Sequence, residues 1–366
     1  MKIKFSILLS IFSFFYLSGT AQIPAGYYDN AVGKQHRELK ESLYEIIKNN
    51  SLLEYTNLWN YFAITDLKDN GKVWDMYSDL PDTIPPYEFT FNTDRCGSEG
   101  YTQEGDCYNR EHSVPNSWFG EKQYPMYSDL FHIYPVDGWV NNKRNNYPYG
   151  NVSNPTWTSK NGSKLGTSAS EGYDGIVFEP IDAYKGDLAR SYFYMCVRYK
   201  DINFSQNEFS QFNGAELAPW ALNQLVEWHL NDPVSQKEID RNNNVYSIQN
   251  NRNPFIDYPE LVGYLWGDDT TQVFAPYVVS TIKQLTERTV TIYPNPAHNQ
   301  VTISTTTPKN SVEIQILDMV GKVVLNYYQE KIDETLLLNI ETLPPGIYAL
   351  SIAEKEKREI HKLIVW

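Results

Sequence analysis

Long apolar segments are absent from this 366-residue chain beyond its N-terminus. No segment after residue 21 approaches the roughly eighteen apolar residues that a transmembrane helix requires, so we expect no transmembrane helix in the mature protein. Basic residues are also in short supply, because 31 Lys and Arg stand against 45 Asp and Glu, for a formal net charge of −14. A chain of this charge repels polyanions at long range, which argues against tight, salt-driven nucleic-acid binding.

The N-terminus carries the one long apolar stretch, and its pattern predicts a secretory signal peptide over residues 1–21. Lys2 and Lys4 form the positive region, Phe5 to Leu17 the apolar core, and Ser18 to Ala21 a small-residue cleavage site. No cysteine stands at the cleavage point, which argues against a lipoprotein anchor. We therefore expect a secreted or cell-surface protein that is exported through the periplasm.

Cysteine is scarce, and three residues of this type allow at most one disulfide within the chain. Cys96 and Cys107 enclose a short Gly-containing loop, and an exported protein meets an oxidising environment. Closing that loop would stabilise the fold by roughly 3 kcal/mol in the chain-entropy model. We predict a Cys96–Cys107 disulfide and a buried free thiol at Cys196.

The residues that carry chemistry gather between positions 109 and 146. Glu111 and His112 follow a basic residue, Asp129 and His132 form a second acid–histidine pair, and residues 141–146 are rich in Asn and Arg. A hard divalent cation prefers oxygen ligands, which a carboxylate and Asn amide carbonyls supply. A histidine can act as a base near neutral pH, and arginines can neutralise phosphate oxygens. Together these groups indicate a metal-assisted nuclease.

The spacing of these residues resembles the endonuclease I family of secreted and periplasmic nucleases. The matching residues are Arg110-Glu111-His112, Pro115, Trp118-Phe119, Asp129-Leu130, His132, Pro135, Gly138, Val140-Asn141, Arg144 and Asn146. Further matches at 178–195 and 241–260 extend the resemblance from about residue 25 to about residue 267. The resemblance implies a ββα-metal core, with the base His112 on a strand and Asn141 on the helix.

The same resemblance implies one Mg²⁺, with Mn²⁺ or Ca²⁺ as alternatives, held by Glu111 and Asn141 together with waters and a substrate phosphate. It implies that His112 is the general base that activates water. So few protein ligands suit Mg²⁺, which keeps several of its waters. We expect a monomeric, largely sequence-nonspecific endonuclease that acts on DNA, with RNA as a further substrate.

Four more residues are candidates, each with two interpretations. Asp129 either orients His112 or caps a helix. Arg144 either clamps a substrate phosphate or forms a surface salt bridge. Arg190, on an otherwise apolar helix, either reaches the substrate or forms a buried ion pair, and His132 is either a core histidine or a ligand.

Two other functions stay open at this point. One is a phosphodiesterase that acts on small phosphoesters with the same metal chemistry, and the other is a non-catalytic surface or adhesion protein that retains the fold. The intact set of Glu111, His112 and Asn141 argues against the second, because a structural role would not require all three.

Periodicity predicts an α+β fold with a mainly helical nuclease domain over residues 22–267 and a linker over 268–288. The alternative for this linker is that residues 273–285 pack on the nuclease domain. Helical spacing occurs at 29–49, around 52–62, at 187–200 and at 215–230. Segments 79–106 and 151–175 are rich in turn-forming residues and are predicted to be loops.

From Thr289 the chain changes to alternating β runs separated by turns, which predicts a small all-β sandwich over residues 289–366. This segment resembles the type A C-terminal sorting domain of the type IX secretion system. The matching features are Tyr293 to Pro296, Gly321-Lys322, Leu343 to Tyr348 and the basic Lys362. The resemblance implies that the secretion machinery is a partner of this domain.

Overall fold

The computed structural model describes residues 23–81, 83–276, 290–318, 322–354 and 357–365. The chain divides into two compact units, residues 1–276 and 277–366. The predicted signal peptide and residues 277–288 of the predicted linker lie outside the described residues. Among the helices that the structure describes, none is long and apolar enough to cross a membrane.

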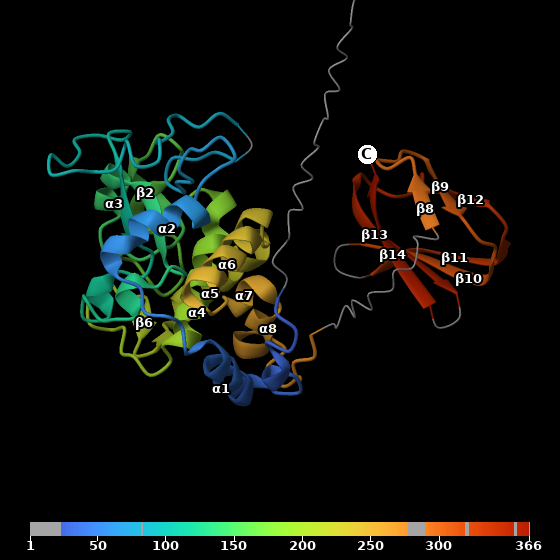
Figure 1. Cartoon of the computed structure of the whole chain (residues 1–366), viewed down its shortest axis with the longest axis horizontal. Coiled ribbons are helices and arrows are strands. Elements are labelled where there is room, and N and C mark those ends of the chain that lie inside the picture. The colour runs from blue at the N-terminus through green and yellow to red at the C-terminus, as the bar shows by residue number, and fades with distance from the viewer. Residues whose placement is uncertain (1–22, 82, 277–289, 319–321, 355–356, 366) are drawn as a thin grey trace, which may run out of the picture. The chain divides into compact units, whose positions relative to one another are not determined.

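The first unit is a mixed α/β domain built around one buried helix, α4 (Lys185–Arg198). Every residue of α4 from Gly186 to Arg198 is buried, in line with the apolar spacing that predicts a helix there. Helices α1, α5 and α7 pack against α4, and Figure 1 shows the helices α4 to α8 grouped together. The other helices of this group are α1 (His36–Ile47), α2 (Leu58–Thr65), α5 (Pro219–Asn231), α6 (Gln236–Gln249), α7 (Pro254–Asp257) and α8 (Leu261–Trp266).

Three of these helices, α1, α2 and α5, fall where helical spacing predicts them, whereas α6 is not among the predicted helices. Its sequence is too polar to show an apolar face. A local signal for its start is nevertheless present, because Ser235 and Glu238 form a reciprocal capping box at its N-terminus. The polar side chains of α6 instead bind partners inside the domain, as shown below.

The predicted loop at 151–175 is wrong in part, because about half of it forms two strands of a three-stranded antiparallel sheet. Strand β4 (Lys164–Ser168) pairs with β3 (Val152–Thr158) on one side and β5 (Ile176–Glu179) on the other. Most of β3 is exposed, so it shows no apolar alternation, and its register shifts at two places. Gly166 is required in β4, since a Cβ there would lie 2.1 Å from the Asn154 carbonyl oxygen. Backbone pairing rather than apolar burial defines this sheet.

Part of the predicted linker packs on the first unit. Phe274 is fully buried, and its ring lies against those of Tyr258 and Tyr264 at centroid distances of 5.6 Å. Its backbone carbonyl accepts a hydrogen bond from the Gly33 amide (2.7 Å), and its amide donates to the Lys34 carbonyl (2.6 Å). The chain therefore leaves this domain after residue 274 rather than at 268.

The second unit is a β domain of two sheets that share one apolar core, as the alternating pattern predicts. One sheet has the order β12-β9-β8 and the other β11-β10-β13-β14, all with antiparallel neighbours. Buried residues alternate along its strands, with Val301, Ile303, Ile314 and Leu350 in the core. The strands are β8 (Val290–Tyr293), β9 (Gln300–Thr305), β10 (Lys309–Leu317), β11 (Val323–Ile332), β12 (Thr335–Asn339), β13 (Gly346–Glu354) and β14 (Lys357–Val365).

Candidate active site

The candidate site is built on two strands and the helix that follows them. Strand β1 (Tyr108–His112) pairs antiparallel with β2 (Ile133–Asp137), and α3 (Gly138–Arg144) begins at the next residue. Asp137 caps α3, because its carboxylate accepts a hydrogen bond from the Val140 amide (2.8 Å). Helix α3 packs against both strands. This connection brings residues 110–112 together with residues 141–144.

The predicted disulfide joins Cys96 to Cys107, the residue directly before β1. The same segment is tied to β1 by backbone hydrogen bonds, from the Cys96 amide to the Tyr108 carbonyl (3.0 Å) and from the Tyr108 amide to the Asp94 carbonyl (2.9 Å). The disulfide therefore fixes the loop at 94–107 beside the start of β1. Cys196 is a buried free thiol on α4, as predicted.

Glu111 lies on the side of β1 that faces the protein interior and is 3% exposed. Its Oε1 accepts hydrogen bonds from the hydroxyls of Tyr77 (2.8 Å) and Tyr149 (3.2 Å) and from the guanidinium of Arg144 (2.8 Å). Burial raises the pKa of this carboxyl, and Arg144 and the two hydroxyls oppose that shift. Since all three donors reach Oε1, the other oxygen, Oε2, is left for a further ligand.

Arg144 is not exposed as a phosphate clamp would be, which corrects the predicted substrate contact. Its side chain is 1% exposed. Besides Glu111, it donates to the carbonyl oxygens of His112 (2.9 Å), Ser113 (2.7 Å) and Tyr147 (3.1 Å). All three guanidinium nitrogens are engaged by the protein, so Arg144 holds Glu111 and the end of β1 in place.

His112 is half-buried at the end of β1, and its ring nitrogens play different roles. The Nε2 atom lies 3.2 Å from the carbonyl oxygen of Tyr127. A carbonyl can only accept, so Nε2 carries the hydrogen and Nδ1 keeps its lone pair. Burial lowers the pKa of His112 to about 3, with a smaller contribution from His132. The imidazole is therefore neutral at physiological pH and can accept a proton at Nδ1.

Asn141 lies on α3 opposite the same stretch of β1. Its side-chain Nδ2 donates to the Arg110 carbonyl oxygen at 3.3 Å, and this contact does not use the amide oxygen Oδ1, which is an acceptor. Glu111 and Asn141 thus offer one carboxylate oxygen and one amide oxygen, a donor set that suits a hydrated Mg²⁺. No cluster of three or more His, Cys, Asp or Glu suited to a metal occurs among the residues that the structure describes. The donors that are present fit a site with few protein ligands.

Asp129 does neither of the two things that the sequence suggests. Its carboxylate, 1% exposed, accepts hydrogen bonds from the hydroxyls of Tyr194 (2.7 Å) and Tyr199 (2.8 Å) and from the Gln249 amide (2.8 Å). These partners lie on α4, at the residue that follows it and on α6, so Asp129 ties the turn before β2 to the helices instead of orienting His112. His132 is a fully buried core histidine whose Nε2 donates to the Met126 carbonyl (2.6 Å).

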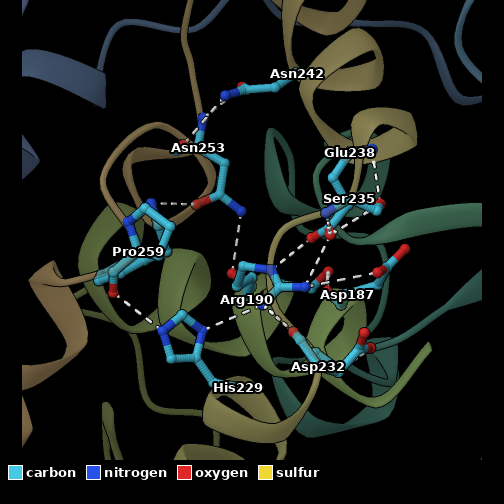
Figure 2. A network of polar contacts seen from close by, with 12 residues as sticks. Asp187, Arg190, His229, Asp232, Ser235, Glu238, Asn242, Asn253 and Pro259 are labelled. Atoms are coloured by element: carbon cyan, nitrogen blue, oxygen red, sulfur yellow. Dashed lines mark hydrogen bonds and ion pairs between the residues drawn. The ribbon is translucent and has the colours of Figure 1, made fainter. Parts of the chain in front are cut away.

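Arg190 forms the buried ion pair rather than a substrate contact. Figure 2 shows its guanidinium enclosed by side chains from α4, α5 and α6. Two of its nitrogens donate to Glu238, Nε to Oε1 (2.5 Å) and Nη2 to Oε2 (2.8 Å), and Nη1 donates to the Asp232 carbonyl (2.9 Å). The side chain is 0% exposed. A fully enclosed guanidinium cannot meet a polymer substrate, so the predicted substrate-binding role of Arg190 is corrected.

Sequence reasoning missed the two tyrosines that hold Glu111. Tyr77 and Tyr149 lie 34 and 38 positions from Glu111 in the chain, and both are fully buried. Their hydroxyls also lie 2.7 Å from each other. No local sequence pattern predicts such partners, because a tyrosine that binds a carboxylate cannot be distinguished in the sequence from any other core aromatic residue.

Two family models match this chain. One, described as Endonuclease I, matches residues 35–260, and the other, described as Secretion system C-terminal sorting domain, matches residues 291–366. The site described above, from Tyr77 to Tyr149, lies within the first match. The second match coincides with the described β domain.

Curated proteins of known name are also similar to the first unit. The extracellular ribonucleases of Bacillus subtilis (strain 168) and Bacillus amyloliquefaciens are each 34% identical to this chain over 248 residues. That alignment covers 66% of this chain and 78% of each relative. Endonuclease-1 of Buchnera aphidicola subsp. Acyrthosiphon pisum (strain APS) is 27% identical over 138 residues, which are 37% of this chain and 47% of the relative.

Proposed function

Because this chain belongs to the endonuclease I family, we propose that it hydrolyses phosphodiester bonds of DNA and RNA with a divalent metal ion, with little sequence selectivity. The family and the C-terminal sorting domain make it a secreted or cell-surface nuclease. The metal, the roles of individual residues and the range of nucleic acids are the parts that we propose.

One observation carries the proposal: within the part of the chain that the structure describes, three neighbouring side chains keep their reactive lone pairs free of hydrogen bonds to the protein. Glu111 has every protein donor on Oε1, Asn141 uses only Nδ2, and His112 uses only Nε2. The remaining Oε2, Oδ1 and Nδ1 are two metal-binding oxygens and one base. Purely structural roles for Glu111, Asn141 and His112 would not explain why these three atoms all stay available in one place.

We assign Mg²⁺ to Glu111 and Asn141. When bound there, the ion would stabilise the negative charge that develops on the phosphate and on the leaving oxygen. Tyr77, Tyr149 and Arg144 fix the orientation of the Glu111 carboxylate and thereby aim Oε2. The positive charge of Arg144 also opposes the rise that burial causes in the pKa of Glu111, and so favours the ionised form that a metal ligand needs.

We assign general-base catalysis to Nδ1 of His112, which would take a proton from the attacking water. Tyr127 fixes the tautomer by accepting the Nε2 hydrogen. The rings of Tyr55 and Tyr127 stack near the imidazole, at 5.5 and 5.3 Å between centroids, and hold its plane. A neutral and oriented imidazole is ready to accept a proton without first losing one.

Both DNA and RNA are proposed as substrates, since the relatives carry the names endonuclease and ribonuclease. The roles proposed for Glu111, Asn141 and His112 all concern the phosphodiester and its attacking water, and none of them involves a base or a 2′-hydroxyl. We therefore expect cleavage that depends on the phosphate backbone rather than on sequence.

The experiment that tests the function is a cleavage assay with the mature protein, which lacks residues 1–21. Supercoiled plasmid and a single-stranded RNA are incubated with protein and Mg²⁺, then with excess EDTA, and then with Mg²⁺ restored. We expect cleavage of both polymers, its loss on chelation and its recovery on re-addition. Mn²⁺ and Ca²⁺ replace Mg²⁺ in parallel reactions and identify the preferred ion.

A small aromatic phosphodiester serves as the control substrate. Cleavage of this compound without cleavage of either polymer would replace the proposal with a phosphodiesterase. Undiminished cleavage of plasmid in excess EDTA would exclude the metal-dependent mechanism.

A further inference from the structure

Arg110 occupies an unusual position beside the candidate site. It precedes Glu111 and His112 on β1, and its guanidinium carbon lies 3.7 Å from the ring centroid of Tyr55 and 4.5 Å from that of Trp59. Its Nη1 donates to the Tyr55 carbonyl oxygen at 2.7 Å. The planar guanidinium is thus in contact with two aromatic rings, and these contacts restrict its orientation.

A second guanidinium continues this arrangement. The carbon of Arg95 lies 4.8 Å from the centroid of the same Trp59 ring, and its side chain is exposed. The backbone of Arg95 bridges to Tyr108 in parallel, two residues before Arg110 on β1. The disulfide at Cys96, the next residue, anchors this segment. Arg95 and Arg110 are therefore neighbouring cations on a rigid part of the surface.

The stack also reaches the proposed base. Tyr55 stacks on Tyr127 at 4.2 Å between centroids, and both rings lie near the imidazole of His112. We name the series Arg95, Trp59, Arg110, Tyr55 and Tyr127 the arginine–aromatic ladder. It leads from an exposed cation at one end to the reacting centre at the other.

The two cations of the ladder have no acidic partner within the described ranges. In contrast, Arg144, Arg190, Arg241 and Arg252 are each paired with a buried carboxylate. The Nε of Arg110 is buried without any hydrogen-bond acceptor. In a chain of net charge −14, two uncompensated and immobilised guanidiniums beside a catalytic pair form a local site for an anion.

The aromatic rings support these cations rather than bind bases. Arg110 and Tyr127 lie 3.7 and 4.2 Å from the Tyr55 ring and cannot occupy one face together, so both faces are covered. A base therefore has no free face of Tyr55 on which to stack. What the ladder presents to a substrate is charge and N–H donors.

We propose that Arg110 and Arg95 bind the backbone phosphates next to the bond that is cut. This inference rests on the proposed nuclease function and assigns the phosphate contacts to these two residues instead of Arg144 and Arg190. Contacts of this kind position the strand and carry no sequence information, which suits nonspecific cleavage. Arg95, farther from His112, binds a more distant phosphate than Arg110 does.

The test compares Arg95→Gln and Arg110→Gln with Arg37→Gln as a matched control. Arg37 is an exposed arginine on α1, far in sequence from the ladder, and its variant makes the same change in charge. Steady-state cleavage of a fluorescent single-stranded DNA oligonucleotide is measured over a series of salt concentrations. Thermal unfolding is recorded for each variant, since Arg110 is half-buried and Arg95 is not.

We expect Arg95→Gln to raise KM about three- to tenfold with little change in kcat, and to reduce the slope of log kcat/KM against log salt by about 0.7, the value for one single-strand phosphate contact. Arg110→Gln should reduce the slope similarly and lower kcat as well. Arg110→Lys keeps the charge and should retain the slope while losing part of the affinity. Arg37→Gln should match the unmodified protein.

The outcomes separate the two levels of the proposal. If the unmodified protein cuts no nucleic acid, the proposed function fails before the ladder is tested. If it cuts, and Arg95→Gln and folded Arg110 variants keep the salt slope and KM of Arg37→Gln, the phosphate contacts are refuted. If Arg110→Gln does not fold, the salt slope and KM of Arg95→Gln and Arg110→Lys, compared with those of Arg37→Gln, test the proposed phosphate contacts instead.

Discussion

The two units of this protein bury very different side chains. The first unit encloses many charged residues, among them Asp66, Glu111, Arg144, Arg190 and Glu238. In the described part of the second unit, the buried polar residues are only Thr305, Lys309 and Ser351. Both units have an apolar core, but only the first also encloses many charged side chains that depend on specific polar partners.

This difference predicts how each unit tolerates change. A buried charge that loses its partner is costly, because the low-polarity interior cannot solvate it. An apolar core that loses a methyl group is weakened more gradually. Function follows the same division, since the candidate site lies in the first unit and combines the buried Glu111 with the half-buried His112 and Asn141. The predictions below test whether catalysis, and the dependence of stability on buried polar partners, are confined to the first unit.

The largest effect is expected from the proposed base. His112→Ala should lower the cleavage rate by roughly 10² to 10⁴, the usual contribution of a general base. Metal affinity should change little, because His112 is not among the proposed ligands. Rates are measured at saturating Mg²⁺, and metal binding by calorimetry. Near-unchanged turnover of this variant would remove His112 from its role.

The proposed ligands should behave in the opposite way. Glu111→Gln keeps an acceptor for Arg144 but loses the negative charge, so it should weaken metal binding while the protein stays folded. Asn141→Ala should also weaken metal binding. If both variants bound the metal as tightly as the unmodified protein, Glu111 and Asn141 would not be its ligands.

The second prediction concerns the network of Figure 2. Arg190→Met should destabilise the first unit by about 3–5 kcal/mol, because Glu238 is left as an uncompensated buried charge. Urea unfolding followed by tryptophan fluorescence reports this unit, since every tryptophan except Trp366 precedes residue 277. The double variant Arg190→Met/Glu238→Leu should recover much of the loss.

Lys309→Met in the second unit is the matched control for this network. Lys309 lies 3.3 Å from the Glu359 carboxylate, whose side chain is 34% exposed, so water already screens the pair. The tryptophan-monitored transition should not move in this variant. An Arg190→Met protein that unfolds like the unmodified one would show that the buried pair contributes nothing to the first unit.

The same division explains how much of the structure the sequence predicts. Apolar periodicity suffices for α4 and for the strands of the second unit, because burial there follows from local alternation. The motif spacing places Glu111 and His112 on β1 and Asn141 on α3. In both cases the signal is contained within a few neighbouring residues.

Long-range polar partners could not be predicted in this way. Arg144, Asp129 and Arg190 each have more than one chemically reasonable partner, and the choice depends on residues tens of positions away. The sheet at 152–179 is not predicted for another reason, since its first strand, β3, is mostly exposed and lacks apolar alternation. Sequence therefore predicts the position of the candidate residues in the fold better than it predicts the residues that contact them.

The third prediction concerns the boundary of the first unit. A chain that ends at Asp269 lacks Phe274, and losing a buried Phe side chain costs about 3–5 kcal/mol. A chain that ends at Pro276 keeps Phe274 and its two backbone hydrogen bonds. We expect the longer protein to unfold at the higher temperature, and both to lack the signal for export beyond the periplasm. Equal melting temperatures of the two shortened chains would show that the packing of Phe274 does not stabilise the first unit.

Phe274→Ala in the full chain is the control that separates packing from length. This variant loses the buried ring but keeps the backbone hydrogen bonds of residue 274. It should therefore reproduce most of the destabilisation of the chain ending at Asp269 if packing of the ring is the cause. Cleavage by the Pro276 chain should equal that of the mature protein. Export of that chain across the outer membrane would contradict the sorting role of the second unit.

The last prediction is a pH dependence that belongs only to the first unit. Asp75 is 1% exposed, and its carboxylate accepts hydrogen bonds from the Tyr77 amide (2.8 Å) and the Asp137 amide (3.0 Å). Burial, and then the negative charge of Asp137, raise the pKa of Asp75 to about 7. The folded state therefore holds this proton more tightly than the unfolded chain, whose carboxyl has a pKa of about 4.

Because the unfolded state loses its proton first, the free energy of unfolding should fall as pH rises from about 4 to about 7, and Asp75 should contribute on the order of 2–4 kcal/mol to that fall. Asp75→Asn cannot ionise and should flatten the slope in this window, whereas the exposed Asp69→Asn should keep it. Urea unfolding monitored by tryptophan fluorescence over this range gives the comparison. Parallel curves for Asp75→Asn and the unmodified protein would mean that the folded state keeps Asp75 ionised. In that case the amides of Tyr77 and Asp137 would outweigh both burial and the neighbouring charge.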